Sequence, residues 1–307
     1  MSLAYGIQLP VQSQSTLYAE GWEADAGPAD LVAVARAVDG AGFDYLACCD
    51  HVAVPRRLAA AMSTVWYDPV ATLAHLAAVT ERVRLLSHVA VVALRHPLVT
   101  AKQYATLDHL SGGRLILGVG AGHVREEFAA LGVDFERRGA VLDESIDALR
   151  AALGPEEFPE HHGKFYDFGG LGQRPRPAQP DVPVWVGGSS PAAVRRAALR
   201  GDGWLPQGDP RERLPAQVAR IRDMRADQGI DAPFTVGAIA EPLYVGRAGW
   251  EVGRRTLTGT PERIAESLRE YRALGVDQIQ VRFRSRSRAE LIDQIRLFGA
   301  EVAPRLN

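Results

Sequence analysis

Short apolar runs alternate with longer amphipathic segments from one end of the chain to the other. Apolar runs of this length are typical of strands buried on both faces of a parallel sheet, and the segments between them have apolar positions at helical spacing. The predicted strands are 5–9, 45–48, 83–90, 114–119, 182–186, 203–205, part of 235–245, and 278–283. The predicted helices are 29–41, 68–79, 97–109, 124–131, 137–153, 191–200, 211–228, 261–274 and 288–302. This order predicts an α/β fold, a (β/α)₈ TIM barrel formed by residues 1–307 as one domain, with the seventh strand as its weakest member.

Two predicted connections are too long to be simple turns. Residues 52–66 follow the second strand, and residues 154–181 precede the fifth. Long loops in compact domains usually carry function, and barrel enzymes place their sites at the carboxyl ends of the strands. We therefore expect both insertions to lie at the C-terminal mouth of the barrel or to cross over it.

Composition narrows the class of partner. Apolar residues make up 47% of the 307 residues and the net charge is −2, which indicates neither a nucleic-acid surface nor a membrane-surface protein and favours a small-molecule substrate. Cys48 and Cys49 are adjacent, so they form no C-x-x-C site, and none of the eight histidines has metal-ligand spacing. With no signal-like or membrane-spanning run, the chain is expected to be cytoplasmic.

A glycine-rich strand end is the most distinctive local feature. The run Leu115-Ile116-Leu117 leads into Gly118, Gly120 and Gly122. Glycines at a spacing of two leave one part of a strand without side chains, so a flat cofactor ring would fit against that backbone. Close packing of backbone elements explains the same pattern equally well.

Three histidines follow or lie within predicted strands. His51, next to Asp50, follows the second strand, where a histidine beside a carboxylate would exchange protons near neutral pH; the alternative is a surface pair. Ser87 and His88 form a polar pair within the third strand, so they need either a ligand or hydrogen-bond partners in the core. His123 either reaches a bound ring or caps a helix. Glu126 and Glu127 are accounted for by the dipole of that helix.

Two segments are suited to anions. Gly187, Gly188, Ser189 and Ser190 join a strand to a helix that opens with proline, and the free N–H groups of such a first turn bind phosphate; an ordinary capped helix is the alternative. Arginines at 195 and 196 would favour an anion there. Arginines also alternate at 282, 284, 286 and 288, as a solvated basic edge or as a contact for an acidic ligand tail.

With these motifs in order, nearly the whole chain resembles the bacterial luciferase-like family, and within it the deazaflavin (coenzyme F420)-dependent oxidoreductases. The resemblance rests on five segments: G-F-D-Y-L-A-C-C-D-H at 42–51, R-H-P-L-V-T-A-K-Q-Y-A-T-L-D-H-L-S-G-G-R-L-I-L-G-V-G-A-G at 95–122, E-R-R-G-A-V-L-D-E-S-I at 136–146, and V-P-V-W-V-G-G-S-S-P with G-D-G-W-L-P at 182–191 and 201–206. Their order and spacing are specific for the family, and less so for the cofactor.

The resemblance implies roles for these residues. Asp50 and His51 match positions that contact the deazaflavin, with the histidine moving protons, and Ser87-His88 matches a bulge with a non-prolyl cis peptide behind the ring. Ala121 and Gly122 match backbone positions near the ring, and Gly187, Gly188 and Ser189 match a phosphate loop. Family members commonly pair, so a homodimer is expected.

The chain also departs from the family's sugar-phosphate dehydrogenases, which have glutamate in place of His123, tryptophan in place of Pro55 and threonine in place of Ala90. Oxidation of a sugar phosphate is therefore not expected. The leading hypothesis is an F420-dependent oxidoreductase that transfers a hydride between the coenzyme and a small organic substrate, with His51 and His123 as its catalytic residues. The alternatives are an FMN-dependent monooxygenase that uses reduced flavin and O₂, and a non-catalytic cofactor-binding relative.

Overall fold

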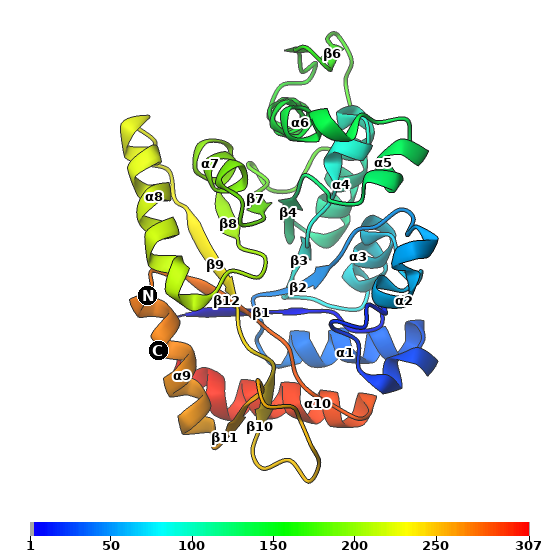
Figure 1. Ribbon diagram of the computed structural model, residues 1–307. Helices are drawn as coiled ribbons and strands as arrows, with labels where there is room; N and C mark the ends of the chain where they lie inside the picture. The colour runs from blue at the N-terminus through cyan, green and yellow to red at the C-terminus, as the bar shows by residue number, and fades with distance from the viewer. Residues whose placement is uncertain (1–2, 307) are drawn as a thin grey trace.

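A closed barrel of eight parallel strands forms the centre of the molecule. The computed structural model describes residues 3–306 and shows the strand order β1-β12-β9-β8-β7-β4-β3-β2 around the barrel (Figure 1). The strands are β1 (Ala4–Gln8), β2 (Tyr45–Cys48), β3 (Arg84–Ser87), β4 (Leu115–Val119), β7 (Val184–Gly187), β8 (Gly203–Leu205), β9 (Thr235–Ile239) and β12 (Gln278–Val281). The predicted TIM barrel is confirmed, including its seventh strand.

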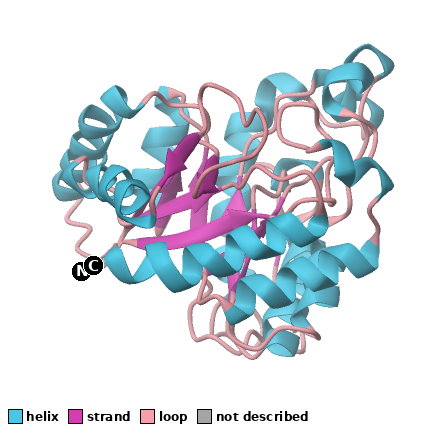
Figure 2. Ribbon diagram, turned by 90° about the horizontal axis from the view of Figure 1, so that it is seen from below, coloured by secondary structure: helices cyan, strands magenta, loops and turns pink. Residues whose placement is uncertain are grey.

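Helices surround this barrel on its outer side (Figure 2). The longer ones are α1 (Pro28–Gly40), α3 (Pro69–Ala77), α4 (Pro97–Ser111), α6 (Arg138–Leu153), α7 (Pro191–Arg200), α8 (Leu214–Asp227), α9 (Pro261–Ala273) and α10 (Arg288–Leu297). The short helices α2 (Ala59–Met62) and α5 (Arg125–Ala130) lie in the segments that follow β2 and β4. The last predicted helix is interrupted, because Phe298–Val302 continues α10 as a π-helix.

Four helices begin with the same local device. A side chain at the N-cap accepts a backbone N–H of the first turn, and proline occupies one of the first two helical positions. The capping residues are Asp68, His96, Ser190 and Thr260. Proline fits there because its missing N–H would have no partner within the helix. The turns after the strands are thus fixed by local chemistry.

The apolar core has two layers. Most of it lies between the strands and the outer helices. A smaller cluster fills the barrel interior and consists of Tyr45, Ala47, Leu86, Ile116, Trp185 and Leu205. Within the barrel, the Tyr45 hydroxyl donates to Gln278 Oε1 at 2.8 Å, so the phenol is buried with a partner. The barrel is therefore a packed core, and ligands are restricted to its ends.

The two long insertions lie in different places. The chain over 52–66 lies at the mouth, where Ser13 and Trp66 form an antiparallel bridge. The chain over 154–181 contains the small hairpin of β5 (His161–His162) and β6 (Asp167–Phe168), which lies outside α6 in Figure 1. Its backbone is held by Glu144 of α6 and by Asp108 of α4. This second insertion thus runs along the outer helices, and its Phe165 and Tyr166 pack against the cluster of Val91 and Phe128, which follow β3 and β4.

None of the helices in residues 3–306 is long and apolar enough to cross a membrane.

Candidate active site

The glycines at the end of β4 are packed against the segment after β3. An added Cβ at Gly118 would collide with the carbonyl oxygen of Ser87, and one at Gly120 would collide with Val89 Cγ2. At Gly187 the nearest atom, Val89 Cγ1, would be 2.7 Å away. The space that the glycines leave is thus filled by protein atoms, so close packing, the alternative left open by the sequence, is what the structure contains.

Ser87 and His88 have different surroundings in the structure. Ser87 is fully buried, and its hydroxyl exchanges hydrogen bonds with the backbone N–H (3.0 Å) and C=O (2.9 Å) of Gly118. It therefore completes the β3–β4 pairing and has no surface free for a ligand. The non-prolyl cis peptide is His88–Val89, one residue later than the resemblance implied.

Asp50 holds the segment after β3 in place. Its Oδ2 accepts from Val91 N at 2.8 Å and from Arg95 at 2.6 Å, and its Oδ1 accepts from Arg95 at 2.8 Å. Because both oxygens already have donors and the residue is only 4% exposed, Asp50 serves as an anchor for this backbone. It is not the carboxylate partner of His51, as the adjacent positions had suggested.

Glu127 of α5 takes that role instead. Its Oε2 lies 3.1 Å from His51 Nδ1, and its Oε1 accepts the backbone N–H groups of Val52 (2.5 Å) and Ala53 (3.2 Å). Burial opposes its ionisation, but the hydrogen bonds from His51, Ala53 and Val52 keep the pKa of Glu127 below the usual carboxyl value. A carboxylate that accepts from Nδ1 leaves His51 Nε2 free to take a proton.

Two aromatic neighbours flank His51. The ring of Trp66 lies edge to face at 4.6 Å between centroids, and the ring of His123 lies at 5.4 Å. Burial, followed by the proximity of His51, lowers the pKa of His123 below the usual histidine value. The two histidines predicted as catalytic therefore meet at the mouth, and His123 remains uncharged near neutral pH.

Glu126 and Glu127 lie in the first turn of α5, as the dipole interpretation requires, but each also has a specific partner. Glu126 pairs with Arg57 in the 52–66 insertion, whereas Glu127 is 2% exposed and holds His51. The sequence contained a signal for this role, because Glu127 shares one face of the helix with the apolar residues Val124 and Phe128. In the structure that face is buried. A carboxylate on a buried helical face needs donors, and a helix dipole does not supply them.

The turn from β7 into α7 retains the features of an anion site. Ser190 caps the helix by accepting from Ala193 N at 3.2 Å, and Gly188 has φ +106°, a conformation that favours glycine. The Ser189 hydroxyl exchanges hydrogen bonds with the backbone of Gln207 at 2.9 and 3.0 Å, which joins this turn to the end of β8. Arg196 contributes no free charge, because it is buried against Asp143.

A cavity of about 110 Å³ lies where six of the barrel strands end. Apart from Tyr18, its lining residues lie at or just after the carboxyl ends of β1, β2, β3, β8, β9 and β12: Gln8, Cys49, His88, Gln207, Ile239, Ala240, Gln280, Val281 and Arg282. His88 Nε2 lies 2.8 Å from Gln207 Nε2, and burial lowers the pKa of His88 to about 4. Within the described chain, His88 Nδ1 and Gln280 Oε1 are buried without a hydrogen-bond partner, as expected where a ligand completes a site.

The arginines after β12 are mostly neutralised within the chain. Arg284 pairs with Glu20 (3.0 Å), Arg286 with Glu290 (3.1 Å) and Arg288 with Asp30 (2.7 Å). The default interpretation, a basic edge, suits these three better than a contact for an acidic tail. Arg282 differs, because it lines the cavity.

Two segments at the mouth are joined by backbone hydrogen bonds. The N–H and the hydroxyl of Thr16 both donate to the carbonyl of Ala61, at 3.0 and 2.8 Å, and Gln14 N donates to Val65 O at 3.2 Å. We call these two segments, 12–19 and 59–67, the rim. The rim places Tyr18 beside the cavity and Trp66 beside His51.

Comparison with known proteins points to one family. Residues 3–252 match the family model described as luciferase-like monooxygenase. The chain is 34% identical to an uncharacterised protein of Mycobacterium tuberculosis, over 68% of this chain and 76% of that protein. It is 30% identical to an F420-dependent glucose-6-phosphate dehydrogenase of Intrasporangium calvum (93% and 98% covered) and 28% identical to an FMNH(2)-dependent dimethylsulfone monooxygenase of Pseudomonas putida (76% and 77%).

Solved structures share the fold. EDTA monooxygenase from Chelativorans sp. superposes with a TM-score of 0.83 at 15% identity, covering 100% of this chain and 93% of that one. The coenzyme F420-dependent tetrahydromethanopterin reductase from Methanopyrus kandleri superposes with a TM-score of 0.77 at 19% identity, and both chains are fully covered.

Proposed function

The chain belongs to the luciferase-like monooxygenase family, a family of oxidoreductases with F420-dependent and FMN-dependent members, and on this premise we propose that it is a deazaflavin (F420)-dependent oxidoreductase acting on a small organic substrate. In this proposal a hydride moves between the coenzyme and a substrate carbon, and a proton moves between the substrate and the protein. The protein therefore needs a group that takes or gives a proton at the mouth.

The observation that carries the proposal is the Glu127–His51 pair. The 3.1 Å contact at Nδ1 fixes the imidazole, and its side chain is only 9% exposed. A histidine held by a buried carboxylate on one nitrogen accepts a proton on the other, and the carboxylate stabilises the resulting cation. His123, at 5.4 Å between centroids, is the second basic group at the same place.

The chain fits the coenzyme at two further points. The N-terminus of α7, with Gly188, Ser189 and Ser190, offers free N–H groups and a positive helix end to a phosphate. The orphaned Nδ1 of His88 and Oε1 of Gln280 offer hydrogen bonds to a polar ring. When bound, the coenzyme supplies hydride chemistry. The residues of this chain then bind the phosphate, orient the ring and move the proton at His51.

A titration tests the choice of cofactor. The purified protein is titrated with oxidised F420 and with FMN, and binding is followed by fluorescence. We expect F420 to bind at least about tenfold more tightly than FMN, a difference of about 1.4 kcal/mol. His51→Ala should retain F420 binding and lose about 10²- to 10⁴-fold in turnover. Equal binding of both cofactors, or tighter binding of FMN, would refute the proposal.

The FMN-dependent monooxygenase remains the second candidate. It is supported by the FMNH(2)-dependent dimethylsulfone monooxygenase among the relatives. The discriminating measurement is oxygen consumption with reduced FMN in the presence of a turned-over substrate. A non-catalytic relative, the third hypothesis, would show no change in any turnover when His51 is replaced.

A further inference from the structure

Arg282 stands apart from the other arginines after β12. Arg284, Arg286 and Arg288 each have a carboxylate partner, whereas Arg282 forms no ion pair with any residue between 3 and 306. Its protein contacts are a long hydrogen bond to Leu17 O (3.3 Å) and the face of Tyr18, whose centroid lies 5.1 Å from the guanidinium carbon. The charge is thus held by neutral groups.

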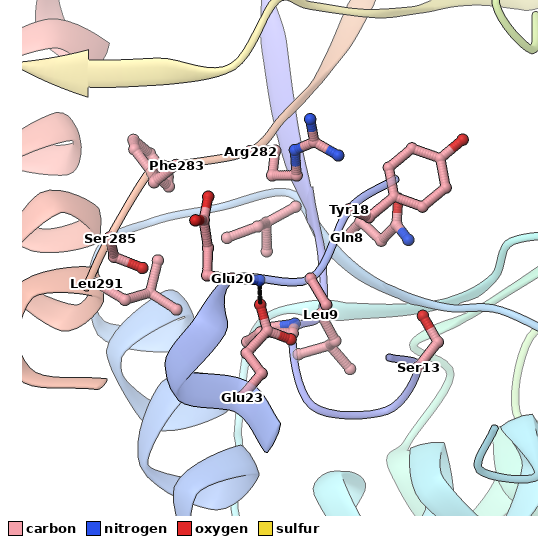
Figure 3. A pocket seen from close by; sticks show the side chains of 13 residues that line it. Gln8, Leu9, Ser13, Tyr18, Glu20, Glu23, Arg282, Phe283, Ser285 and Leu291 are labelled. Carbon is pink, nitrogen blue, oxygen red and sulfur yellow. Dashed lines mark hydrogen bonds between the residues drawn. The ribbon is translucent and has the colours of Figure 1, made fainter. Parts of the chain in front are cut away.

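The side chain is also directed away from the nearest acids. Figure 3 shows the small neighbouring cavity of about 30 Å³, lined by Glu20, Glu23 and Arg282 among others, with the guanidinium turned from both carboxylates toward Tyr18. Glu20 is paired with Arg284, and Glu23 accepts the backbone N–H groups of Glu20 and Val11, at 2.8 and 2.7 Å. These two carboxylates are therefore already occupied.

Every other polar group of the 110 Å³ cavity is neutral. Gln8, Gln207 and Gln280 carry amides, Cys49 has its pKa raised to about 12 by burial, and His88 is uncharged because burial lowers its pKa to about 4. Burial also lowers the pKa of Arg282, and the smaller opposing effects of Tyr18, Glu20 and Glu23 do not offset it. Among the described residues that line the cavity, Arg282 thus carries the one charge.

We propose that this cavity binds the carboxylate of a small monoanionic substrate, with Arg282 as the residue that binds it. A planar guanidinium matches a carboxylate with two parallel N–H···O bonds, and one half-buried cation balances one negative charge. A phosphate would bring a second charge, and the described residues that line the cavity include no second cation for it. This inference deepens the proposed function, since it assigns a substrate class to the same mouth.

The test uses two probes of equal shape, benzoate and benzamide, titrated into the full-length protein saturated with its coenzyme. Binding is measured by calorimetry or ligand-observed NMR. We expect benzoate to bind at least about tenfold more tightly than benzamide. Arg282→Gln should remove this preference, and Arg286→Gln, a matched change in an exposed, already paired arginine, should retain it. Equal binding of the two probes by the wild type, or an unchanged preference in Arg282→Gln, would overturn the inference.

Two controls separate the remaining explanations. Arg282→Lys keeps the charge but loses the planar pair of N–H donors, so it should retain part of the preference for benzoate. Melting temperatures identify any variant that fails to fold. If Arg282→Gln weakens binding of intact F420 but not of its chromophore without the acidic tail, the tail is the anion and the substrate assignment is wrong. If the wild type binds neither F420 nor FMN and still prefers benzoate in the coenzyme-free protein, the proposed function fails and this inference stands.

Discussion

The carboxylate of Glu127 makes three hydrogen bonds, one with the imidazole of His51 and two with the backbone N–H groups of the residues just after His51. It therefore fixes the ring of His51 and the start of the 52–66 insertion at once. Because the pKa of Glu127 is lowered in the folded state, the stability that these hydrogen bonds contribute is fully present above the ordinary carboxyl pKa. It is lost as the pH falls through the lowered pKa of the folded state.

Glu127→Gln tests this role. The amide preserves the shape, and its oxygen still accepts from Val52 and Ala53, but its NH₂ group cannot accept from His51 Nδ1. We expect kcat/KM to fall about 10²-fold while the coenzyme dissociation constant stays within about twofold, because the change disturbs the proton-handling group only. Steady-state kinetics and a coenzyme titration measure the two effects.

The control is Glu126→Gln, one residue away, whose partner Arg57 is largely exposed. That change should leave kcat/KM near the wild-type value, because an exposed ion pair contributes little. If Glu127→Gln also retains wild-type kcat/KM, the Glu127–His51 pair has no part in turnover.

At the scale of elements, the mouth is organised by the contact between β4 and the segment after β3. Gly118, Gly120 and Gly187 are small because Ser87 and Val89 occupy the space beside them. The glycine pattern was visible in the sequence, but its cause was not. Packing depends on a neighbouring strand distant in sequence, and glycine marks a close approach without identifying what approaches.

Gly118→Ala should therefore destabilise the whole barrel. The new methyl group meets the backbone oxygen of Ser87, which cannot move without breaking the β3–β4 pairing. We expect a loss of at least about 1–3 kcal/mol in the free energy of unfolding, measured by urea denaturation. Gly40→Ala, in α1 with no atom within 4 Å of the added methyl group, is the matched control and should be neutral or slightly stabilising. Equal effects of the two changes would show that the close packing is not a constraint.

At the scale of the whole molecule, most of the fold was predictable because the spacing of apolar residues along the sequence distinguishes strands from helices. The (β/α)₈ order, the first insertion and the meeting of His51 with His123 followed from strand ends converging on one face. Long-range pairings were not predictable. Asp50 binds Arg95, Glu127 binds His51, and the 154–181 segment follows Asp108 and Glu144, because these partners are chosen by tertiary packing, which leaves no local pattern.

Stability of the whole chain should depend on pH through His88. Its pKa in the folded state is about 4, against an ordinary value of 6.5, because the ring is buried. Between these values the unfolded chain takes up a proton that the folded chain does not, so stability is full above pH 6.5 and decreases as the pH falls toward 4. The loss amounts to about 3 kcal/mol.

Urea denaturation at pH 7.5, 5.5 and 4.5 measures this dependence. His88→Gln removes the titrating group, so the variant should lose less stability than the wild type between pH 7.5 and pH 4.5. Parallel slopes for the two proteins would mean that His88 does not titrate in this range.

The rim has a consequence for how this protein can be diversified. Thr16, Gln14, Ala61 and Val65 join its two segments largely through main-chain atoms, which every residue type except proline supplies alike. Side chains of the rim that face solvent, such as Leu17 at 70% exposure, are consequently free to vary without altering the course of the backbone. Mutagenesis libraries aimed at new specificity should therefore concentrate on such positions. At these positions, a change of side-chain chemistry has the least effect on the yield of folded protein.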